Sequence, residues 1–489
     1  MMTQESRFGS LIDEDRRLEP AEVDDLVGRA VRAIDQAGLA GRRLAVLGEN
    51  RAGTLIAHLG ALCAGVSSVP VPRYLGADEI VPVLLDSGAG AILSGPATAE
   101  VAGKAAAGAG IAHLSYDTWT AGAAPSPLRL DRPAATLLVY TSGTTGRPKG
   151  TEMRWLAVLP GSVEEHLAAL AAASPFPPGP HLVVGPLHHT GPLSALRHAL
   201  AGGDVVVLPR FDPEAVLRAV AEHGVTSSVM VPTHFARLLA LPAAVRRRYD
   251  VGSLRRVVHT GAACPPVVKR AMIDWWGPVL SEAYGGSESG TVCSIGSEEW
   301  LAHPGSVGRP VPGFEALVLD DEGRPLPAGE EGALWFRDRS GRGVRYHGAA
   351  AGEGEAGLFT LGEIGRIDAD GYVYITDRGS DMVVSGGVNL YPAEAEAVLA
   401  RHPAVADAAV IGVPHADMGE ALHALVVPAA GTPPPAPEEL DAFCRSRLAA
   451  PKCPRSFELV ESVGRDAMGK IDKRALRRPY WPTDRTIGG

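Results

Sequence analysis

The 489-residue chain carries 46 Lys and Arg against 56 Asp and Glu, a formal net charge of −10. This acidic balance argues against general nucleic-acid binding, which requires a basic face. Apolar residues make up 46% of the chain and charged residues 21%, proportions typical of a soluble globular protein with a sizeable core rather than of a disordered one.

The cysteines and the hydropathy favour the cytoplasm. The five cysteines are scattered, odd in number and without a CxxC spacing, so we expect reduced thiols and no zinc site. The first residues, MMTQESRFGSLIDEDRR, lack the apolar centre of a signal peptide. No stretch reaches the ~18–20 apolar residues of a membrane span. We therefore expect a cytoplasmic protein with no stable membrane association.

Helical and strand patterns alternate through the first half of the chain. Apolar residues recur at helical spacing over 21–39, where Gly38 marks the end, and a short buried strand is predicted at 42–48. The alternation then recurs, with helices at 54–65 and 213–224 and strands at 67–72, 203–209 and 225–232. Strands that alternate with helices predict an α/β architecture with largely parallel sheets.

After about residue 300 the pattern changes. Paired strands joined by a turn at Asp321–Gly323 are predicted over 314–338, and a hairpin turning at Asp370–Gly371 is predicted over 366–378. The last 110 or so residues mix a helix at 392–402 with strands at 405–414 and 421–428, which predicts a small α+β domain. A proline-rich loop is expected at 430–439.

The stretch YTSGTTGRPKG, residues 140–150, follows the apolar run AATLLV. A loop that cradles a triphosphate needs glycines for close backbone approach, hydroxyl donors and a cation. All three are present, in Thr141, Ser142, Gly143, Thr144, Thr145, Gly146 and Lys149. A plain Gly/Ser/Thr turn is the alternative, but the strand in front, the density of donors and the lysine favour phosphate binding. The loop is not a Walker A motif, because no Ser or Thr follows its lysine.

This loop resembles the signature of the adenylate-forming enzymes, which include acyl-CoA synthetases, nonribosomal adenylation domains and firefly luciferase. Further segments resemble the family's motifs in the family's order, at 186–193, 259–266, 281–289, 361–378, 381–396 and 468–476. The stretches SGGVNLYPAEAE and RRPYW resemble CoA ligases for free organic acids more than partners of carrier proteins. The resemblance spans essentially the whole chain.

The resemblance implies a fold and a reaction. The fold is a large domain of α/β subdomains with a small β-barrel-like part over residues 1–378, then a small mobile α+β domain over 379–489, with a hinge at about 378–381. In the reaction, a carboxylate attacks the α-phosphorus of ATP to give acyl-AMP and pyrophosphate, and the thiol of coenzyme A then displaces AMP. Cations and Mg²⁺ offset the charge of the two anions.

The same resemblance assigns roles to single residues. Lys470 is the adenylation lysine, and His189 lies between the acid pocket and the thiol tunnel. Glu288 is the Mg²⁺ ligand, a hard oxygen donor of the kind that ion prefers. The adenine and ribose would be bound by Gly261, Ala262, Ala263, Tyr284, Gly285, Ser287, Glu363 and Arg378. The pantetheine tunnel would be lined by Ser385, Gly386 and Gly387.

His188 precedes His189 and makes the choice of histidine less certain. We expect no metal at this pair, because adjacent side chains on an extended segment face opposite ways.

Several positions depart from the family's pattern. The ribose acid is Glu363 where Asp is usual, Gly379 and Ser380 stand at the hinge, and Glu152 follows the phosphate loop. A misplacement by about one bond length can cost ~10²-fold in rate. Three alternatives therefore stay open: a ligase that only converts a supplied acyl-AMP to acyl-CoA, a nucleotide-binding sensor without activity, and a luciferase-like oxygenase. For the acid, we expect a bulky, mostly apolar molecule.

Overall fold

The computed structural model describes residues 6–13, 16–119, 121, 128–141, 149–153, 155–287, 289–320, 322–340, 357–378, 381–385, 388–415, 418–448, 450–466 and 469–481. Several predicted site residues therefore lie outside the described part of the chain: Ser142, Gly143, Thr144, Thr145, Gly146, Glu288, Gly386 and Gly387. The turn residue Asp321 and the hinge residues Gly379 and Ser380 also lie outside it.

A four-stranded parallel sheet contains the first predicted strands. Its order is β4-β3-β5-β6, with strands Ser67–Pro70, Arg43–Leu47, Ala89–Ser94 and Ala112–Ser115. The helices between them are α1 (Pro20–Gln36), α2 (Ala52–Ala64), α3 (Ala77–Ser87) and α4 (Ala99–Ala109). The predicted helices at 21–39 and 54–65 are confirmed, and α1 and α2 share one apolar core.

A nine-stranded sheet forms the second layer, in the order β15-β14-β13-β12-β11-β9-β10-β1-β2. Strands β1, β10, β9, β11, β12 and β13 run parallel to one another, as the alternation predicted, and β2, β14 and β15 at the two ends pair antiparallel. The short N-terminal strands β1 and β2 were not predicted, because three residues carry no usable periodicity. The strands are β1 (Leu11–Asp13), β2 (Arg16–Leu18), β9 (His181–Val183), β10 (Val205–Val207), β11 (Ser227–Met230), β12 (Arg256–His259), β13 (Leu280–Gly286), β14 (Gly290–Gly296) and β15 (Arg309–Pro310).

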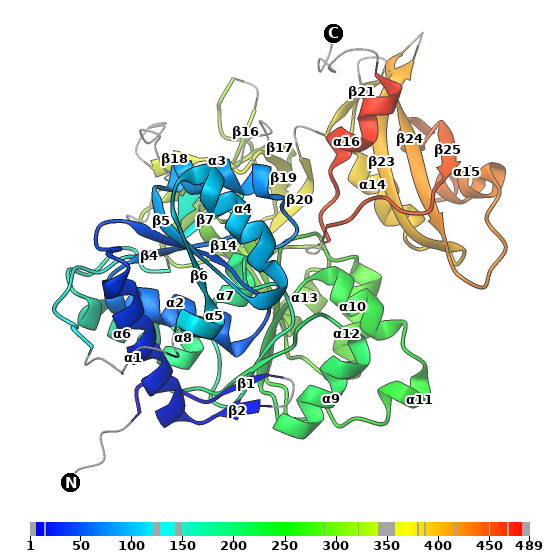
Figure 1. Ribbon diagram of the computed structural model, residues 1–489. Helices are drawn as coiled ribbons and strands as arrows, with labels where there is room; N and C mark the ends of the chain where they lie inside the picture. The colour runs from blue at the N-terminus through cyan, green and yellow to red at the C-terminus, as the bar shows by residue number, and fades with distance from the viewer. Residues whose placement is uncertain are drawn as a thin grey trace.

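Short connections and helices join these strands. Helices α9, α10 and α12 follow strands β10, β11 and β12, and they pack on the sheet through a second apolar core. Figure 1 shows them together on the green side of the molecule, below the small C-terminal part. The helices are α6 (Val163–Ala172), α7 (Thr190–Leu193), α8 (Ala195–Leu200), α9 (Pro213–His223), α10 (Pro232–Leu239), α11 (Ala243–Arg246), α12 (Pro266–Trp276) and α13 (Ser297–Ala302).

An antiparallel five-stranded sheet follows, as the change of pattern after residue 300 predicted. Its strands are β16 (Phe314–Leu319), β17 (Gly332–Asp338), β18 (Leu358–Phe359), β19 (Glu363–Ile367) and β20 (Val373–Arg378). The predicted hairpin is β19–β20, and it turns where the Gly371 N–H donates to the Asp368 carbonyl at 3.0 Å. Gly371 has a φ of +85°, a conformation that favours glycine.

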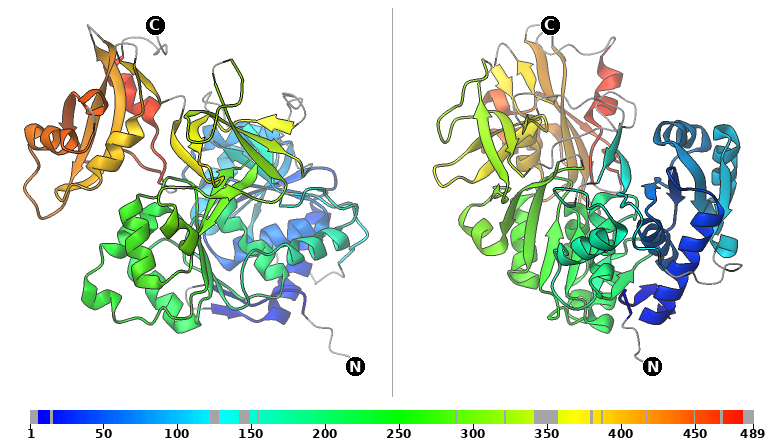
Figure 2. Two further views of the ribbon diagram at one scale, coloured as in Figure 1. Left: turned by 180° about the vertical axis from the view of Figure 1, so that it is seen from behind. Right: turned by 90° about the vertical axis from the view of Figure 1, so that its left-hand side faces the viewer.

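The C-terminal residues build their own sheet and core. The sheet contains β21 (Val383–Ser385), β22 (Val388–Leu390), β23 (Val405–His415), β24 (Gly419–Pro428) and β25 (Ser456–Leu459). It is covered by α14 (Pro392–Leu399), α15 (Pro437–Arg445) and α16 (Lys473–Arg477). Figures 1 and 2 show these orange and red elements as a separate body at one end. The fold class is confirmed, whereas the boundary at 378–381 stays a prediction.

Two buried histidines are expected to make the fold sensitive to acid. Burial lowers the pKa of His58 on α2 and of His234 on α10 to about 3, from an ordinary value of 6.5. Between these values the unfolded chain takes up protons that the folded chain excludes, so stability falls as the pH falls. Between about pH 7.5 and about pH 5.5, each histidine should lower the free energy of unfolding by about 1 kcal/mol. Urea unfolding at the two pH values measures this loss.

The control for this prediction is His58→Gln. The Nδ1 atom of His58 lies 2.8 Å from the Ser68 hydroxyl, and a glutamine amide can keep a hydrogen bond there without titrating. The variant should therefore lose about 1 kcal/mol less than the wild type on acidification. An equal loss in both proteins would contradict the assignment of a neutral His58.

Candidate active site

Four segments that are distant in the sequence meet at one edge of the nine-stranded sheet. Strands β9, β11, β12 and β13 are parallel neighbours, paired as Val183 with Val229, Met230 with His259, and His259 with Glu282. Their carboxyl ends therefore lie side by side, and in open α/β sheets this edge is where ligands bind. The segments after these strands carry His189, residues 231–235, Gly261–Ala263 and Tyr284–Ser287.

The loop after β12 is shaped for close approach to a ligand. Gly261 has a φ of +87°, in the left-handed region that favours glycine. Gly261 and Ala263 are exposed, and the Thr260 N–H donates to the Met230 carbonyl of β11 at 3.2 Å. Gly285 has a different reason to be glycine, because a Cβ there would collide with the Gly290 carbonyl at a β-bulge.

The predicted adenine and ribose residues contact each other. The Tyr284 hydroxyl donates to Oε2 of Glu363 at 2.8 Å, and Glu363 is only 8% exposed. Arg378 lies opposite Glu363 in the β19–β20 register. Glu363 is longer by one methylene than the family's Asp, and the structure ties its carboxylate to Tyr284. The two segments, 79 residues apart, are therefore joined at the site.

The predicted phosphate loop lies in the sequence between the two strands of a hairpin. Strand β7 (Leu138–Thr141) pairs antiparallel with β8 (Lys149–Glu152), so Thr141 stands opposite Lys149 where the loop begins and ends. The Tyr140 hydroxyl donates to the Asp86 carboxylate on α3, which anchors the start of the loop. Glu152 is the last residue of β8, and it is half-buried between the buried residues Thr151 and Met153, so its side chain lies on the opposite face of the strand from Thr151.

The two adjacent histidines contact each other, which corrects the expectation that they face opposite ways. Their ring centroids are 4.3 Å apart, and the His189 N–H donates to the Pro186 carbonyl at 3.1 Å. The segment is a turn rather than an extended strand, so strand alternation does not apply. His188 is buried beside Tyr74, with centroids 5.8 Å apart. Within the described residues there is no group of three His, Cys, Asp or Glu side chains that could hold a metal ion.

His189 faces the segment that carries Lys470. Burial lowers the pKa of His189 to about 4; the Asp466 carboxylate raises it and the Lys470 ammonium lowers it. Burial, with smaller electrostatic contributions from His189 and Arg73, lowers the pKa of His188 to about 2. Burial therefore keeps both rings neutral near pH 7, and the choice of His189 over His188 stays a prediction.

Lys470 lies on a tight turn of the small C-terminal part. Its N–H donates to the Asp466 carboxylate at 2.8 Å, and the Arg465 guanidinium donates to the Gly469 carbonyl at 2.8 Å. Gly469 has a φ of +77°, and a Cβ there would lie 2.9 Å from the Thr233 methyl on α10. Figure 1 shows this segment, in red, running from the small part down to the large one. The turn thus seats Lys470 at the edge of the large sheet.

Other predicted residues are placed in part. Ser385 is buried at the end of β21, while the backbone of Thr141, Lys149 and Arg378 is described without their side chains. All five cysteines are free thiols, and Cys264 is the half-buried one. Within the described part of the chain, no helix is long and apolar enough to cross a membrane.

The sequence reasoning missed Asp466, Thr233 and a buried ion pair between Lys269 and Glu282. The pair had a signal, because Lys269 falls on the buried stripe of α12 with Met272, Ile273 and Trp276. A lysine on an apolar stripe is unusual unless it is paired. Asp466 and Thr233 had no such signal, since their positions depend on how the turn packs on α10.

A large α/β part whose sheet edge meets a lysine from a small C-terminal part defines an adenylate-forming enzyme. Comparison with known proteins agrees with this class. A family model described as AMP-binding enzyme matches residues 3–342, and one described as AMP-binding enzyme C-terminal domain matches residues 394–470. The chain belongs to the AMP-binding enzyme family, and the predicted class of acyl-CoA synthetases within the adenylate-forming superfamily is confirmed.

Three similar proteins cover nearly all of the chain. A feruloyl-CoA synthase from an Amycolatopsis species is 34% identical over 94% of this chain and 93% of its own length. The o-succinylbenzoate CoA synthetase of Bacillus subtilis, solved with its acyl-adenylate intermediate, has a TM-score of 0.80 at 28% identity, covering 96% of this chain and 95% of its own. An amide bond synthetase from Marinactinospora thermotolerans has a TM-score of 0.83 at 28% identity, covering 97% of each chain.

Proposed function

We propose that this acid–thiol ligase performs both half reactions, activating a bulky, mostly apolar carboxylic acid with ATP and transferring the acyl group to coenzyme A in the cytoplasm. The observation that carries the proposal is the seat of the Lys470 turn on α10, where a Cβ on Gly469 would lie 2.9 Å from the Thr233 methyl. An ammonium group at this edge suits the first half reaction, in which two anions must approach each other.

The placement of Glu363 supports the adenylation step over a ligase that needs ready-made acyl-AMP. The Tyr284 hydroxyl donates to its buried carboxylate at 2.8 Å. Although Glu363 replaces the family's Asp, its carboxylate is therefore held in place next to Tyr284, the side chain predicted to lie against adenine. Ribose hydroxyls would donate to the remaining acceptor positions of that carboxylate. Mg²⁺ would be held by Glu288, and it would offset the charge of the phosphates.

Apolar residues at the expected acid pocket support the choice of substrate class. The segment after β11, where we expect part of the acid pocket, carries the buried apolar residues Val231 and Pro232 beside His234, while Met230 and Phe235 pack in the core. The similar proteins point the same way, since one is named a feruloyl-CoA synthase and another a ligase for a methyl-dioxo-octahydroindenyl propanoyl group. An aromatic, fatty or polycyclic acid would fit such surroundings better than a small polar one.

ATP–pyrophosphate exchange compared with thioester formation from synthetic acyl-AMP tests the proposal. The panel should contain cinnamic, long-chain fatty and polycyclic propanoic acids, with acetate as a small polar control. We expect exchange and acyl-CoA formation with at least one bulky acid and neither with acetate. Thioester formation without exchange would favour the ligase that requires acyl-AMP, and the absence of both activities would favour a sensor. Formation of an amide when an amine is offered in place of coenzyme A would instead identify an amide-forming enzyme.

A further inference from the structure

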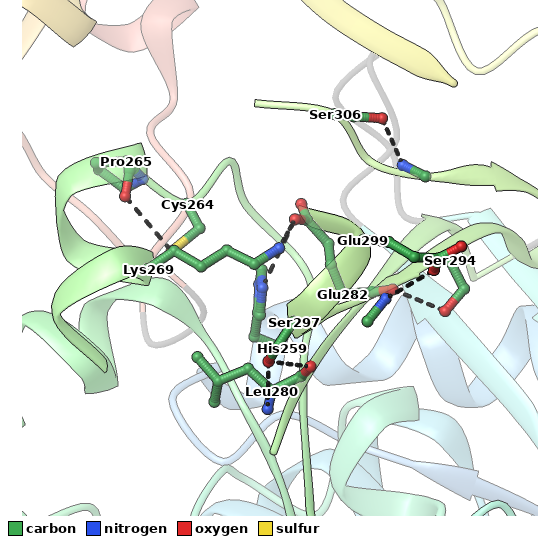
Figure 3. A network of polar contacts seen from close by, with 12 residues as sticks. His259, Cys264, Pro265, Lys269, Leu280, Glu282, Ser294, Ser297, Glu299 and Ser306 are labelled. Atoms are coloured by element: carbon green, nitrogen blue, oxygen red, sulfur yellow. Dashed lines mark hydrogen bonds and ion pairs between the residues drawn. The ribbon is translucent and has the colours of Figure 1, made fainter. Parts of the chain in front are cut away.

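A buried ion pair lies directly behind the loop that is proposed to bind adenine. Nζ of Lys269 is 2.6 Å from Oε2 of Glu282, and the two residues are 0% and 8% exposed. The ammonium also lies 4.8 Å from the ring centroid of Trp300. Figure 3 shows Lys269 and His259 converging on the Glu282 carboxylate, with Cys264 alongside.

His259 completes the cluster. Its Nε2 atom is 3.6 Å from the same Glu282 oxygen, and its ring is fully buried without a hydrogen-bond partner among the described residues. Burial, reinforced by the nearby Lys269 ammonium, holds the pKa of His259 well below its ordinary value, so the ring is neutral. The pair of charges is therefore Lys269 and Glu282, and His259 packs beside it as a neutral polar side chain.

The cluster connects every segment that frames the adenine loop. His259 is the last residue of β12, immediately before the loop at 260–265, and Lys269 lies on α12, which begins immediately after it. Glu282 lies on β13, two residues before Tyr284. The loop is thus closed at its base by a contact between the helix that follows it and the strand that carries Tyr284, the side chain proposed to lie against adenine.

Stability alone is a poor reason for this pair. A buried ion pair pays for desolvation of both charges, and well-packed apolar residues of similar volume are often as stable or more so. What a charged pair adds is direction, because the 2.6 Å hydrogen bond fixes the distance between α12 and β13. An apolar contact between the same elements would allow them to slide.

We propose that Lys269 and Glu282 are positioning residues for the nucleotide, which hold the Gly261–Ala263 loop at the distance from Tyr284 that adenine binding requires. This inference rests on the proposed function, because it assumes that adenine binds between the loop and Tyr284. Neither residue is a catalytic residue, since the ion pair lies in the core behind the loop.

The test replaces both charges at once, as Lys269→Met with Glu282→Leu. Because no charge is left unpaired, the double variant should fold and melt at or above the wild-type temperature. It should nevertheless bind AMP about 10–10²-fold more weakly, since displacement of a binding group by about 1 Å costs that much. The KM for ATP should rise by a similar factor, while the KM for coenzyme A stays unchanged. Calorimetry with AMP and steady-state kinetics measure these values.

Two further variants keep the test decisive. Glu282→Gln keeps the shape and a hydrogen-bond partner for Lys269. Burial already lowers the pKa of Lys269, so the lysine can become neutral instead of remaining an unpaired charge, and this variant should stay within about 10-fold of the wild-type AMP affinity. If the double variant fails to fold, Glu282→Gln still reports on the loop through the labelling rate of Cys264, the half-buried thiol among four buried ones. Lys104→Met with Glu100→Leu removes an exposed pair of the same residue types, joined at 2.7 Å, and should change neither constant.

The outcomes separate this inference from the proposed function. Wild-type protein that binds no AMP would overturn the proposed nucleotide site and this inference with it. Wild-type protein that binds AMP, with a folded double variant of equal affinity and equal KM for ATP, would overturn only the positioning role. Equal rises in the KM for ATP and for coenzyme A would indicate a general structural loss and would also overturn it. If the double variant does not fold, Glu282→Gln decides. A changed labelling rate of Cys264 without loss of AMP affinity would overturn the positioning role, whereas a changed labelling rate together with a loss of AMP affinity would support it.

Discussion

Replacement of Lys470 by alanine is expected to slow acyl-adenylate formation by about 10²–10³-fold, the usual loss when one preorganised stabiliser of a charged transition state is removed. Thioester formation from ready-made acyl-AMP should be largely spared, because the new charge in adenylation arises at the phosphate. The structure gives this prediction its physical basis, since Gly469, next to Lys470, lies against Thr233 on α10, and the Lys470 ammonium lowers the pKa of His189. ATP–pyrophosphate exchange and single-turnover thioester formation measure the two halves separately.

A second lysine of the small C-terminal part provides the control. Lys452 is partly exposed and forms an ion pair with Glu394 at 2.7 Å, and no contact in the described part of the chain joins it to the large sheet. Lys452→Ala removes the same charge from the same small C-terminal part, so both half reactions should keep wild-type rates. Equal losses in both half reactions for Lys470→Ala would argue against its role in adenylation.

Replacement of Glu363 by alanine is expected to lower kcat/KM for ATP by about 10²-fold, because hydrogen bonds to a charged acceptor contribute about 1.5–3 kcal/mol. The more informative change is Glu363→Asp, which introduces the residue that the family's pattern favours. A carboxylate shortened by one methylene no longer reaches the Tyr284 hydroxyl, now 2.8 Å away. We therefore expect Glu363→Asp to weaken ATP use by about 10-fold rather than to improve it.

A double-mutant cycle with Tyr284→Phe decides between the two views of Glu363. If the hydrogen bond positions the acid, Tyr284→Phe and Glu363→Asp together should cost no more than Glu363→Asp alone. A gain of activity in Glu363→Asp would show that the longer acid is a defect for which the Tyr284 contact does not compensate. The measurements are initial rates of pyrophosphate release over a range of ATP concentrations.

The sequence by itself determined the alternation of strands and helices, the separate C-terminal sheet and the order of the motifs. These depend on local patterns: the apolar stripe of α1, the hydrophobic run of β3 and the glycine at the β19–β20 turn are each visible within a few residues. The phosphate loop between β7 and β8 was predicted for the same reason, since its donors and glycines are consecutive.

Only the tertiary structure decided three contacts at the candidate site. They are the hydrogen bond between Tyr284 and Glu363, the packing of His188 on His189, and the close approach of Gly469 to Thr233. Each contact depends on the register of a sheet or on the packing of a turn. Register and turn packing cannot be calculated from spacing along the chain. The ion pair of Lys269 and Glu282 was indicated in part by the sequence and in part only by the tertiary structure. Its lysine stood on an apolar stripe in the sequence, but its carboxylate partner was fixed only when β13 was placed beside α12.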